Sequence, residues 1–137
     1  MGGSAMGSNA TLGQRNNNPL NIRYNRLNKW NGQVGENKGF CVFSEKKYGY
    51  RASFILLRTY SRRGINTIRE IINTWAPPTE NNTIAYIRYV SEKTGIPADV
   101  PLSFSFENLA PVVMAMAQLE SNIQATYSEL EQAFKMV

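Results

Sequence analysis

Residues 106–121 have the sequence FENLAPVVMAMAQLES, in which apolar side chains recur three and four positions apart. This spacing predicts an amphipathic helix with one buried stripe, because residues three or four apart share a helix face. Glu120 continues the stripe, four residues after Met116 and three after Ala117. The helix therefore either ends its buried face at Ala117, leaving Glu120 in solvent, or places a carboxyl group among apolar neighbours. The stripe before Glu120 consists of Leu109, Val112, Val113, Met116 and Ala117.

The rest of the chain predicts a small β-hairpin followed by helices. Residues 15–43 are rich in Asn, Gly and aromatic residues and contain short stretches in which apolar and polar residues alternate. This pattern indicates a loop and an irregular hairpin closed near residues 31–39. Helical patterns follow, and most of them are bounded by Gly or Pro: residues 48–64, 66–76, 81–95 and 128–134. A hairpin followed by helices predicts an α+β domain that is mostly α.

Length and composition fit a single domain. The chain has 137 residues, of which 42% are hydrophobic, so it can bury a proper core. Residues 1–13 begin with small residues and predict a flexible leader or a cloning remnant, which leaves residues 14–137 as the domain. The apolar runs are too short for a membrane helix, so no membrane insertion is expected. Cys41, within GFCVF, is expected to be a buried and inert thiol.

Several kinds of catalysis are excluded by the residues that the sequence lacks. It contains no histidine, which removes Ser-His and Cys-His triads and the zinc motifs that need histidine. Asp99 is the single aspartate, so acid–base chemistry must rest mainly on glutamates. The net charge of +5 suits an anionic partner, such as nucleic acid or a bacterial wall polymer.

A buried carboxyl group at position 120 would have the properties of a general acid. Burial disfavours the charged form and raises the pKa, and the nearby helix C-terminus also disfavours a negative charge. A protonated glutamic acid in a cleft can give its proton to the leaving oxygen of a glycosidic bond. Glu120 is therefore the candidate catalytic residue, and the alternative is a solvated glutamate beyond the end of the buried stripe.

Several short motifs resemble the lysozyme-like peptidoglycan hydrolases and lytic transglycosylases. AQLES, at residues 117–121, resembles their "ALESG"-type catalytic helix. NNNPLNIR, KWNGQ, FCVFS and ILLRTY resemble pieces that follow this helix in the flagellar-type glucosaminidases of that superfamily. Here they precede it. The resemblance therefore implies a lysozyme-like domain with a small hairpin, circularly permuted so that the catalytic-Glu helix is C-terminal. Permutation costs little where the original termini are adjacent on the surface.

Residues 14–122 also resemble a phage-associated and bacterial family with the pattern RNNNPGNIR, LLRTY, NTIREII and APPSENNT-x-x-Y, ended by a HENG-like motif. The chain has Leu20 where that family has glycine, and LESN in place of HENG. The resemblance implies cleavage of the glycan strands of peptidoglycan, as a muramidase or lytic transglycosylase. It also implies that Glu120 serves as both acid and base and that no metal or cofactor is required.

The Asn-rich segment supplies the first candidates for substrate binding. Asn17, Asn18, Asn21 and Arg23 are chosen because amides can hold acetamido groups and a guanidinium can hold a carboxylate. Runs of Asn in turns also bond to their own backbone, so this alternative stays open for the run at residues 16–18. Two tryptophans can stack on sugar rings or belong to the core: Trp30 and Trp75.

The segment ENNTIAYIRYV supplies further candidates, because it resembles the E-T-x-x-Y-V segment of lytic transglycosylases. Tyr86 is expected to lie near Glu120 or the sugar, with a plain core tyrosine as the alternative. Glu80 and Asn82 are expected to shape the groove, although an acid in a loop is often only solvated. Glu36, in the hairpin, is the possible second acid of a hydrolase, or else an exposed hairpin residue.

Two other functions fit parts of the sequence. The same fold can bind wall glycan without cleaving it, as a cell-wall-binding or virion structural module. Basic segments with tyrosine suggest nucleic-acid binding, but no recognisable binding motif accompanies them, so no nucleic acid is expected. The chain is expected to act as a monomer in the periplasm or at the cell wall. The sequence has no recognisable signal peptide, so delivery by a virion, by a secretion system or within a larger protein is expected.

Overall fold

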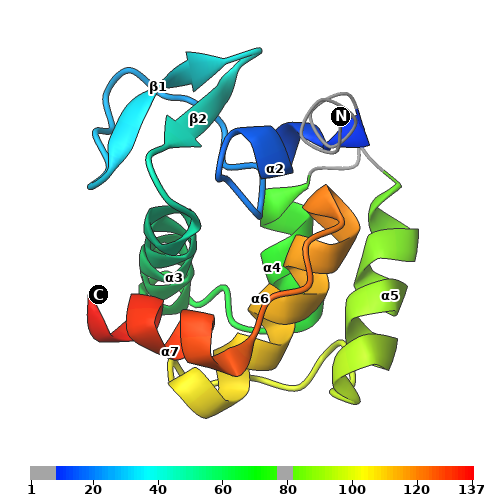
Figure 1. Cartoon of the computed structure of the whole chain (residues 1–137). Coiled ribbons are helices and arrows are strands. Elements are labelled where there is room, and N and C mark those ends of the chain that lie inside the picture. Colours follow the sequence, from blue (N-terminus) through cyan, green and yellow to red (C-terminus); the bar gives the residue numbers. More distant parts are fainter. Residues whose placement is uncertain (1–8, 77–81) are drawn as a thin grey trace.

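The computed structural model describes residues 9–76 and 82–137 (Figure 1). It has an antiparallel two-stranded sheet near the start and helices over most of the remaining chain, so the predicted α+β, mostly helical class is confirmed. The elements are α2 (Leu12–Arg15), β1 (Gln33–Asn37), β2 (Phe40–Phe43), α3 (Lys46–Arg62), α4 (Ile68–Trp75), α5 (Thr83–Thr94), α6 (Phe106–Ser121) and α7 (Tyr127–Lys135).

The hairpin of β1 and β2 closes through a two-residue turn. Lys38 and Gly39 occupy it with φ of 54° and 88°, and positive φ at both turn positions matches the right-handed twist of the strands. A register irregularity lies between Gln33 and Gly35. The hairpin is anchored on α3 by a small apolar cluster, Ile22, Cys41, Phe43 and Ala52. Burial raises the pKa of the Cys41 thiol, which keeps it protonated and inert.

Local signals set the ends of most helices. Capping boxes begin α2 at Thr11, α4 at Thr67 and α7 at Thr126, and in each the threonine hydroxyl accepts from the N–H three residues later. Gly95 ends α5 in the left-handed conformation that glycine adopts readily. These signals are readable in the sequence, so the helices lie close to their predicted ranges.

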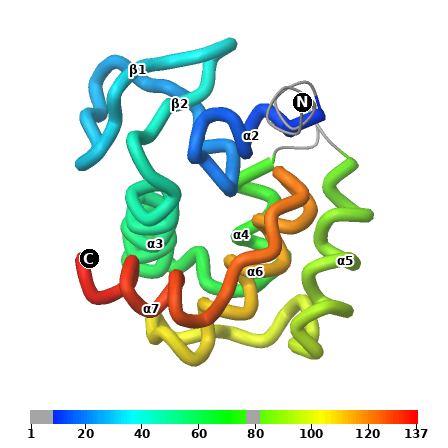
Figure 2. The backbone as a smooth tube through the Cα atoms, in the orientation of Figure 1, coloured from blue at the N-terminus to red at the C-terminus, as the bar shows by residue number. Residues whose placement is uncertain are grey.

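The N-terminal side of the domain differs from expectation. The leader was expected to extend to residue 13, but the chain is folded against α6 from Thr11, whose hydroxyl donates to the Ser121 carbonyl at 2.7 Å. The four-residue helix α2 was not predicted, because so short a helix has no periodicity to detect. The Asn-rich segment also lies beside the end of the glutamate helix, because the Asn21 Nδ2 donates to the Glu120 carbonyl at 3.1 Å. The C-terminus lies elsewhere, beside α3, because α7 follows α6 and carries the chain there (Figure 2).

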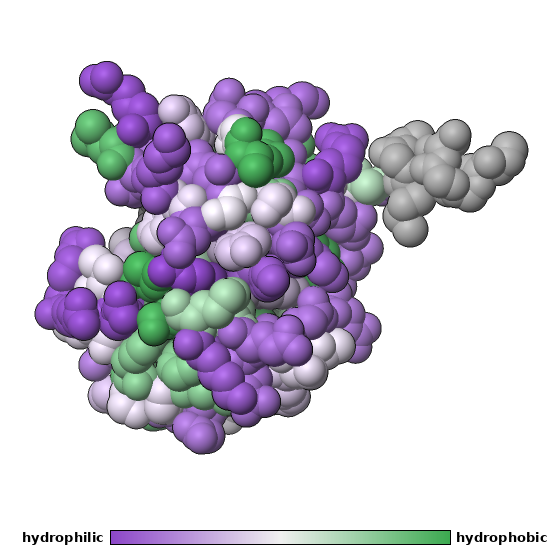
Figure 3. All heavy atoms as spheres, turned by 60° about the vertical axis from the view of Figure 1, so that its left-hand side comes forward, coloured by the Kyte–Doolittle hydropathy of each residue, from purple (hydrophilic) through white to green (hydrophobic). Residues whose placement is uncertain are grey.

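The surface that includes the hairpin and α3 is mainly hydrophilic, with hydrophobic patches between the polar groups (Figure 3). Exposed apolar side chains near the hairpin include Leu27 and Val34. Within the two described ranges, no helix is both long and apolar enough to span a bilayer.

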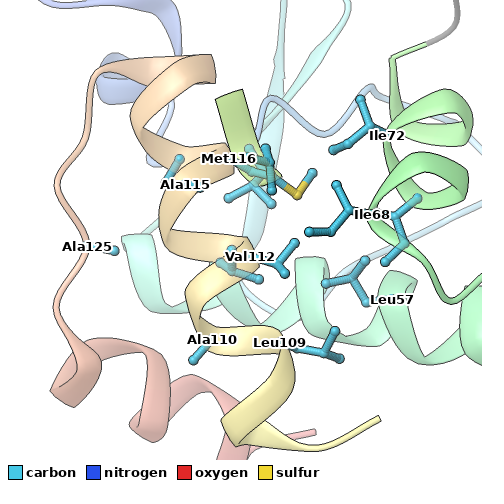
Figure 4. Packing of buried hydrophobic residues seen from close by; sticks show 14 of the residues in the cluster. Leu57, Ile68, Ile72, Leu109, Ala110, Val112, Ala115, Met116 and Ala125 are labelled. Atoms are coloured by element: carbon cyan, nitrogen blue, oxygen red, sulfur yellow. The ribbon is translucent and has the colours of Figure 1, made fainter. Parts of the chain in front are cut away.

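The main core forms around α6. Its predicted stripe, from Leu109 to Ala117, is buried with at most 4% of any of its side chains exposed. Figure 4 shows Val112 and Met116 facing Ile68 and Ile72 of α4. Each large aliphatic side chain buried in this way contributes about 1.5–3 kcal/mol. The rigid packing of α6 fixes the direction of its last turn, which carries Glu120.

Candidate active site

Glu120 lies in the last turn of α6 and is held by side chains from two other segments. The Asn21 Nδ2 donates to Glu120 Oε1 at 3.1 Å and to the Glu120 backbone carbonyl at 3.1 Å. The Tyr86 hydroxyl donates to Glu120 Oε2 at 3.0 Å. Glu120 is therefore partly buried and hydrogen-bonded, and the alternative of a solvated glutamate beyond the stripe is wrong.

The local conformation of each partner follows from its sequence context. Asn21 follows Pro19-Leu20 and has φ of 52°, a left-handed conformation that asparagine tolerates better than most residues. This turn aims its amide at the end of α6. Tyr86 lies on the buried face of α5 and is 4% exposed, so its ring belongs to the core while its hydroxyl reaches Glu120. Tyr86 is therefore both a core tyrosine and a neighbour of Glu120.

The environment of Glu120 raises its pKa. Burial is the largest cause, because it disfavours the charged carboxylate. Hydrogen bonds from Asn21 and Tyr86 and the positive charge of Arg23 act in the opposite direction. Burial beside the Glu120 carboxylate also holds the pKa of Tyr86 well above its ordinary value, so the phenol remains the hydrogen-bond donor.

Glu120 opens onto a groove of about 770 Å³. Aromatic, amide and cationic side chains dominate its walls, and Glu120 is the one carboxyl group among the described lining residues. The lining consists of Asn21, Ile22, Arg23, Tyr24, Asn25, Arg26, Asn28, Trp30, Phe40, Leu56, Tyr60, Trp75, Ala76 and Glu120.

The groove is electrostatically positive beside the carboxyl group. The Arg23 guanidinium lies over the Phe40 ring at 5.1 Å and interacts with the Glu120 charge. Arg26 adds a second exposed cation to the lining. Within residues 9–76 and 82–137, no three His, Cys, Asp or Glu side chains gather in a way that could hold a metal ion. The arrangement suits proton transfer by Glu120 to a polar ligand that carries negative charge.

Two of the predicted Asn residues hold the backbone together and do not line the groove. The Asn18 amide is fully buried, accepts from the Ile22 N–H at 2.9 Å and donates to the carbonyls of Ile22 and Cys41, both at 3.0 Å. The Asn17 amide donates to the Phe43 carbonyl at 3.0 Å. The alternative of turn residues bonded to backbone describes these two better than sugar binding does.

Of three other candidates, two lie apart from the site and one falls outside the residues that the structure describes. Asn82 is the N-cap of α5 and accepts from the Ala85 N–H at 3.2 Å. Glu36 is exposed in β1, and its carboxylate accepts from the Gly39 N–H at 2.7 Å, so it is not placed as a second acid. Glu80 falls outside the described residues.

Several groove residues were not predicted. Tyr24, Phe40 and Tyr60 add aromatic surface, while Trp30 and Trp75, which were considered for sugar stacking, do line the groove. The Trp75 Nε1 donates to the Leu20 carbonyl at 3.1 Å, which fixes its ring against the Asn-rich segment. Tyr24 lies in an irregular loop, where side chains follow no period, so its direction could not be predicted from the sequence.

The chain has a clear relative among known proteins. No protein-family model matches it. It is 37% identical over 132 residues to Protein P5 of Pseudoalteromonas phage PM2, an alignment that covers 92% of this chain and 81% of that protein. At this identity and coverage, the chain belongs to the same family as Protein P5 of Pseudoalteromonas phage PM2.

Proposed function

We propose that this protein cleaves the glycan strands of peptidoglycan and that Glu120 is the general acid. The observation that carries this proposal is the contact set of Glu120: a carboxyl group with a raised pKa, held by Asn21 and Tyr86 at the edge of a polar and aromatic groove. A raised pKa leaves a larger share of the carboxyl population protonated at a given pH than an ordinary glutamate would have, and the protonated form is the one that a glycosidic oxygen needs.

The groove matches the chemistry of a wall glycan. Faces of Tyr24, Trp30 and Trp75 can pack on sugar rings, and the neighbouring asparagine amides can pair with acetamido groups. Arg23 and Arg26 can bind the carboxylate of a lactyl ether or of a stem peptide. Neutral glycans such as chitin lack that carboxylate.

The reaction needs one carboxyl group. Glu120 gives its proton to the glycosidic oxygen as the C1–O bond breaks. The resulting carboxylate then takes the proton of the muramoyl C6 hydroxyl, and O6 bonds to C1 to give a 1,6-anhydro product. If water donates the proton and oxygen instead, the product is a reducing sugar. Glu120 is the one acid among the described groove residues, which favours the first route, because hydrolysis commonly uses two carboxylates.

The proposed fold is a circularly permuted lysozyme-like domain acting as a monomer without a cofactor. Contact between the Asn-rich segment and the end of α6 supports the permutation, since these pieces are sequence neighbours in the unpermuted proteins. Action at the cell wall or in the periplasm follows from the substrate, with delivery by a virion, by a secretion system or within a larger protein.

The test is mass analysis of fragments released from purified sacculi by the parent and by Glu120→Gln. The parent should release muropeptides, with anhydro ends if the lytic route holds and with reducing ends if water attacks. The Gln variant keeps the shape but has no proton to transfer, so its rate should fall at least about a hundredfold. Equal release by both proteins would contradict the proposal.

One observation favours the second candidate, a wall-binding or virion structural module without turnover. Both Glu120 oxygens already accept hydrogen bonds, an arrangement that stabilises the ionised form. Sedimentation of both proteins with sacculi distinguishes the two functions. Binding by both without release of fragments would establish the module.

A further inference from the structure

The end of α6 that carries Glu120 is held by a second set of hydrogen bonds, which comes from the start of the domain. The Thr11 hydroxyl donates to the Ser121 carbonyl at 2.7 Å. The Gln14 Nε2 donates to the carbonyls of Ser121 at 3.1 Å and Asn122 at 3.0 Å. Carbonyls at a helix C-terminus have no partner within the helix, so donors from outside must satisfy them.

Thr11 and Gln14 are themselves locked together by the capping box of α2. The Gln14 N–H donates to the Thr11 hydroxyl at 3.1 Å, and the Thr11 N–H donates to the Gln14 Oε1 at 3.2 Å. The Gln14 amide therefore uses its oxygen for the box and its nitrogen for α6. A capping box accepts either Glu or Gln, but only Gln can also donate, so the residue type fits the second task.

The close approach of α2 to α6 depends on Gly13 between these two residues. A Cβ at Gly13 would stand 1.8 Å from the Ser121 Oγ and 2.8 Å from the Asn18 carbonyl oxygen. The Ser121 hydroxyl in turn donates to the Pro19 carbonyl at 2.7 Å. The α2 backbone is thus packed directly on the residue that follows Glu120.

We infer that Thr11 and Gln14 are positioning residues for Glu120, because their side chains tie the last turn of α6 to the segment that carries Asn21. This role rests on the proposed function of Glu120 as the acid, but the geometric part can be measured without activity. Neither side chain lies among the groove residues, so both act through the backbone of α6.

Loss of these hydrogen bonds should loosen the last turn of α6 and open it to water. Glu120 would then spend less time against Asn21 and Tyr86. The charged or titratable groups that act on it are Arg23 from the loop and Tyr86 from α5. Burial is the largest effect on Glu120, so exposure should bring its pKa down toward the ordinary value of a glutamate.

The test compares identical substitutions in two capping boxes. Thr11→Val and Thr126→Val each remove a threonine N-cap, from α2 and from α7. Only Thr11 donates to α6, whereas the Thr126 hydroxyl bonds to Glu129 within its own box. Gln14→Leu is a second variant of the α2 box that removes both amide functions.

Two measurements are made below the melting temperature of every variant. The first determines kcat and KM separately on solubilised glycan strands. The second is the titration of the Glu120 carboxyl carbon by ¹³C NMR, with the signal assigned by its absence in Glu120→Gln. For Thr11→Val and Gln14→Leu, kcat should fall about tenfold with little change in KM, the scale of a small misplacement of a reacting group. Their Glu120 pKa should also fall, and Thr126→Val should match the parent in both.

The outcomes separate the positioning role from the proposed function. An unchanged Glu120 titration in Thr11→Val and Gln14→Leu would overturn the positioning role, whatever the activity. The same pKa shift in Thr126→Val would show that any loss of stability moves the Glu120 pKa, and that Thr11 and Gln14 have no specific positioning role. If the parent cleaves nothing but the titration shifts as expected, the positioning of Glu120 stands and the enzymatic function fails.

Discussion

At the scale of single residues, Glu120 is subject to two opposing effects that a stability measurement can separate. Burial raises the pKa of its carboxyl group, whereas Asn21, Tyr86 and Arg23 favour the carboxylate without fully offsetting the burial. The native state therefore holds the Glu120 proton more tightly than the unfolded chain does. Stability then falls as pH rises from the unfolded pKa through the native pKa, because the unfolded state releases the proton first.

Glu120→Gln removes this pH-dependent loss of stability, because the glutamine side chain does not titrate. The variant should match the parent near pH 4 within about 1 kcal/mol, the scale of one hydrogen bond. Relative to the parent, it should gain stability as pH rises toward neutral, and it should be equal or mildly more stable there. Thermal melts of both proteins across this range provide the measurement. A variant that loses stability relative to the parent with rising pH would show that the carboxylate is favoured by folding.

Tyr86→Phe tests the hydrogen bond on the other carboxylate oxygen. Its loss leaves Glu120 Oε2 without that donor, so the Glu120 pKa should rise further and the alkaline limit of activity should move to higher pH. Above the native pKa the variant should lose about 1.5–3 kcal/mol, the scale of a hydrogen bond to a charged group, and less in acid. Melts at several pH values and a pH–rate profile check both effects.

Tyr50→Phe is the matched control for this substitution. Tyr50 is fully buried, and its hydroxyl has no hydrogen-bond partner among the described residues. Removing an unsatisfied buried hydroxyl should be neutral or stabilising, by up to about 1 kcal/mol, with no change in the pH profile. If both Phe variants behave alike, the Tyr86 hydroxyl has no special relation to Glu120.

Residue chemistry made part of the site predictable and left part of it open. The apolar stripe before Glu120 made a partly buried carboxyl group predictable, and Tyr86 was expected beside it from the resemblance to lytic transglycosylases. Asn21 was expected as a substrate-binding amide, and its hydrogen bond to Glu120 was not. Asn17 and Asn18 have the same side chain as Asn21, yet their amides bond to backbone carbonyls. Which amide faces a groove depends on backbone turns that sequence spacing does not encode.

At the scale of elements, α2 shows how a short helix can depend on tertiary contacts. Gly13→Ala would place a Cβ against Ser121 and Asn18 and should cost about 1–3 kcal/mol, as overpacking of a tight interior does. Gly35→Ala is the control, because nothing lies within 4 Å of the added Cβ and its backbone is not left-handed. Gly35→Ala should stay within about 0.5 kcal/mol of the parent.

Chemical denaturation of both glycine variants measures this difference. Equal stability of the two would mean that α2 moves away from α6 without cost. A loss confined to Gly13→Ala would establish the close packing of α2 on Ser121 as part of the native fold.

The longer elements were predictable because their signals are local. The helices α3 to α7 follow apolar periodicity. Threonine or asparagine caps begin α4, α5 and α7, a serine caps α6, and Gly95 ends α5. The hairpin closes at a turn of Lys38 and Gly39. Helix α2 has four residues, and its capping side chains also bond to a segment more than a hundred residues away. Such contacts are visible only when the whole chain is folded.

At the scale of the whole molecule, the site joins segments that are distant in the chain. Asn21 and Glu120 are 99 residues apart in sequence, and Tyr86 comes from a third element. The groove between them carries Arg23 and Arg26 within a chain of net charge +5. A general positive charge attracts any polyanion, whereas cations fixed in the groove act on the ligand bound there.

Two charge reversals distinguish these effects. Arg26→Glu and Arg88→Glu lower the net charge equally and both sites are exposed, but only Arg26 lines the groove. Arg26→Glu should weaken binding to sacculi about fivefold, which corresponds to about 1 kcal/mol for an exposed charge interaction. Arg88→Glu should change binding much less. Rising salt should weaken binding by the parent and reduce the difference between the variants, because exposed charges are screened. Equal losses in both variants would mean that net charge, and not the groove, attracts the wall polymer.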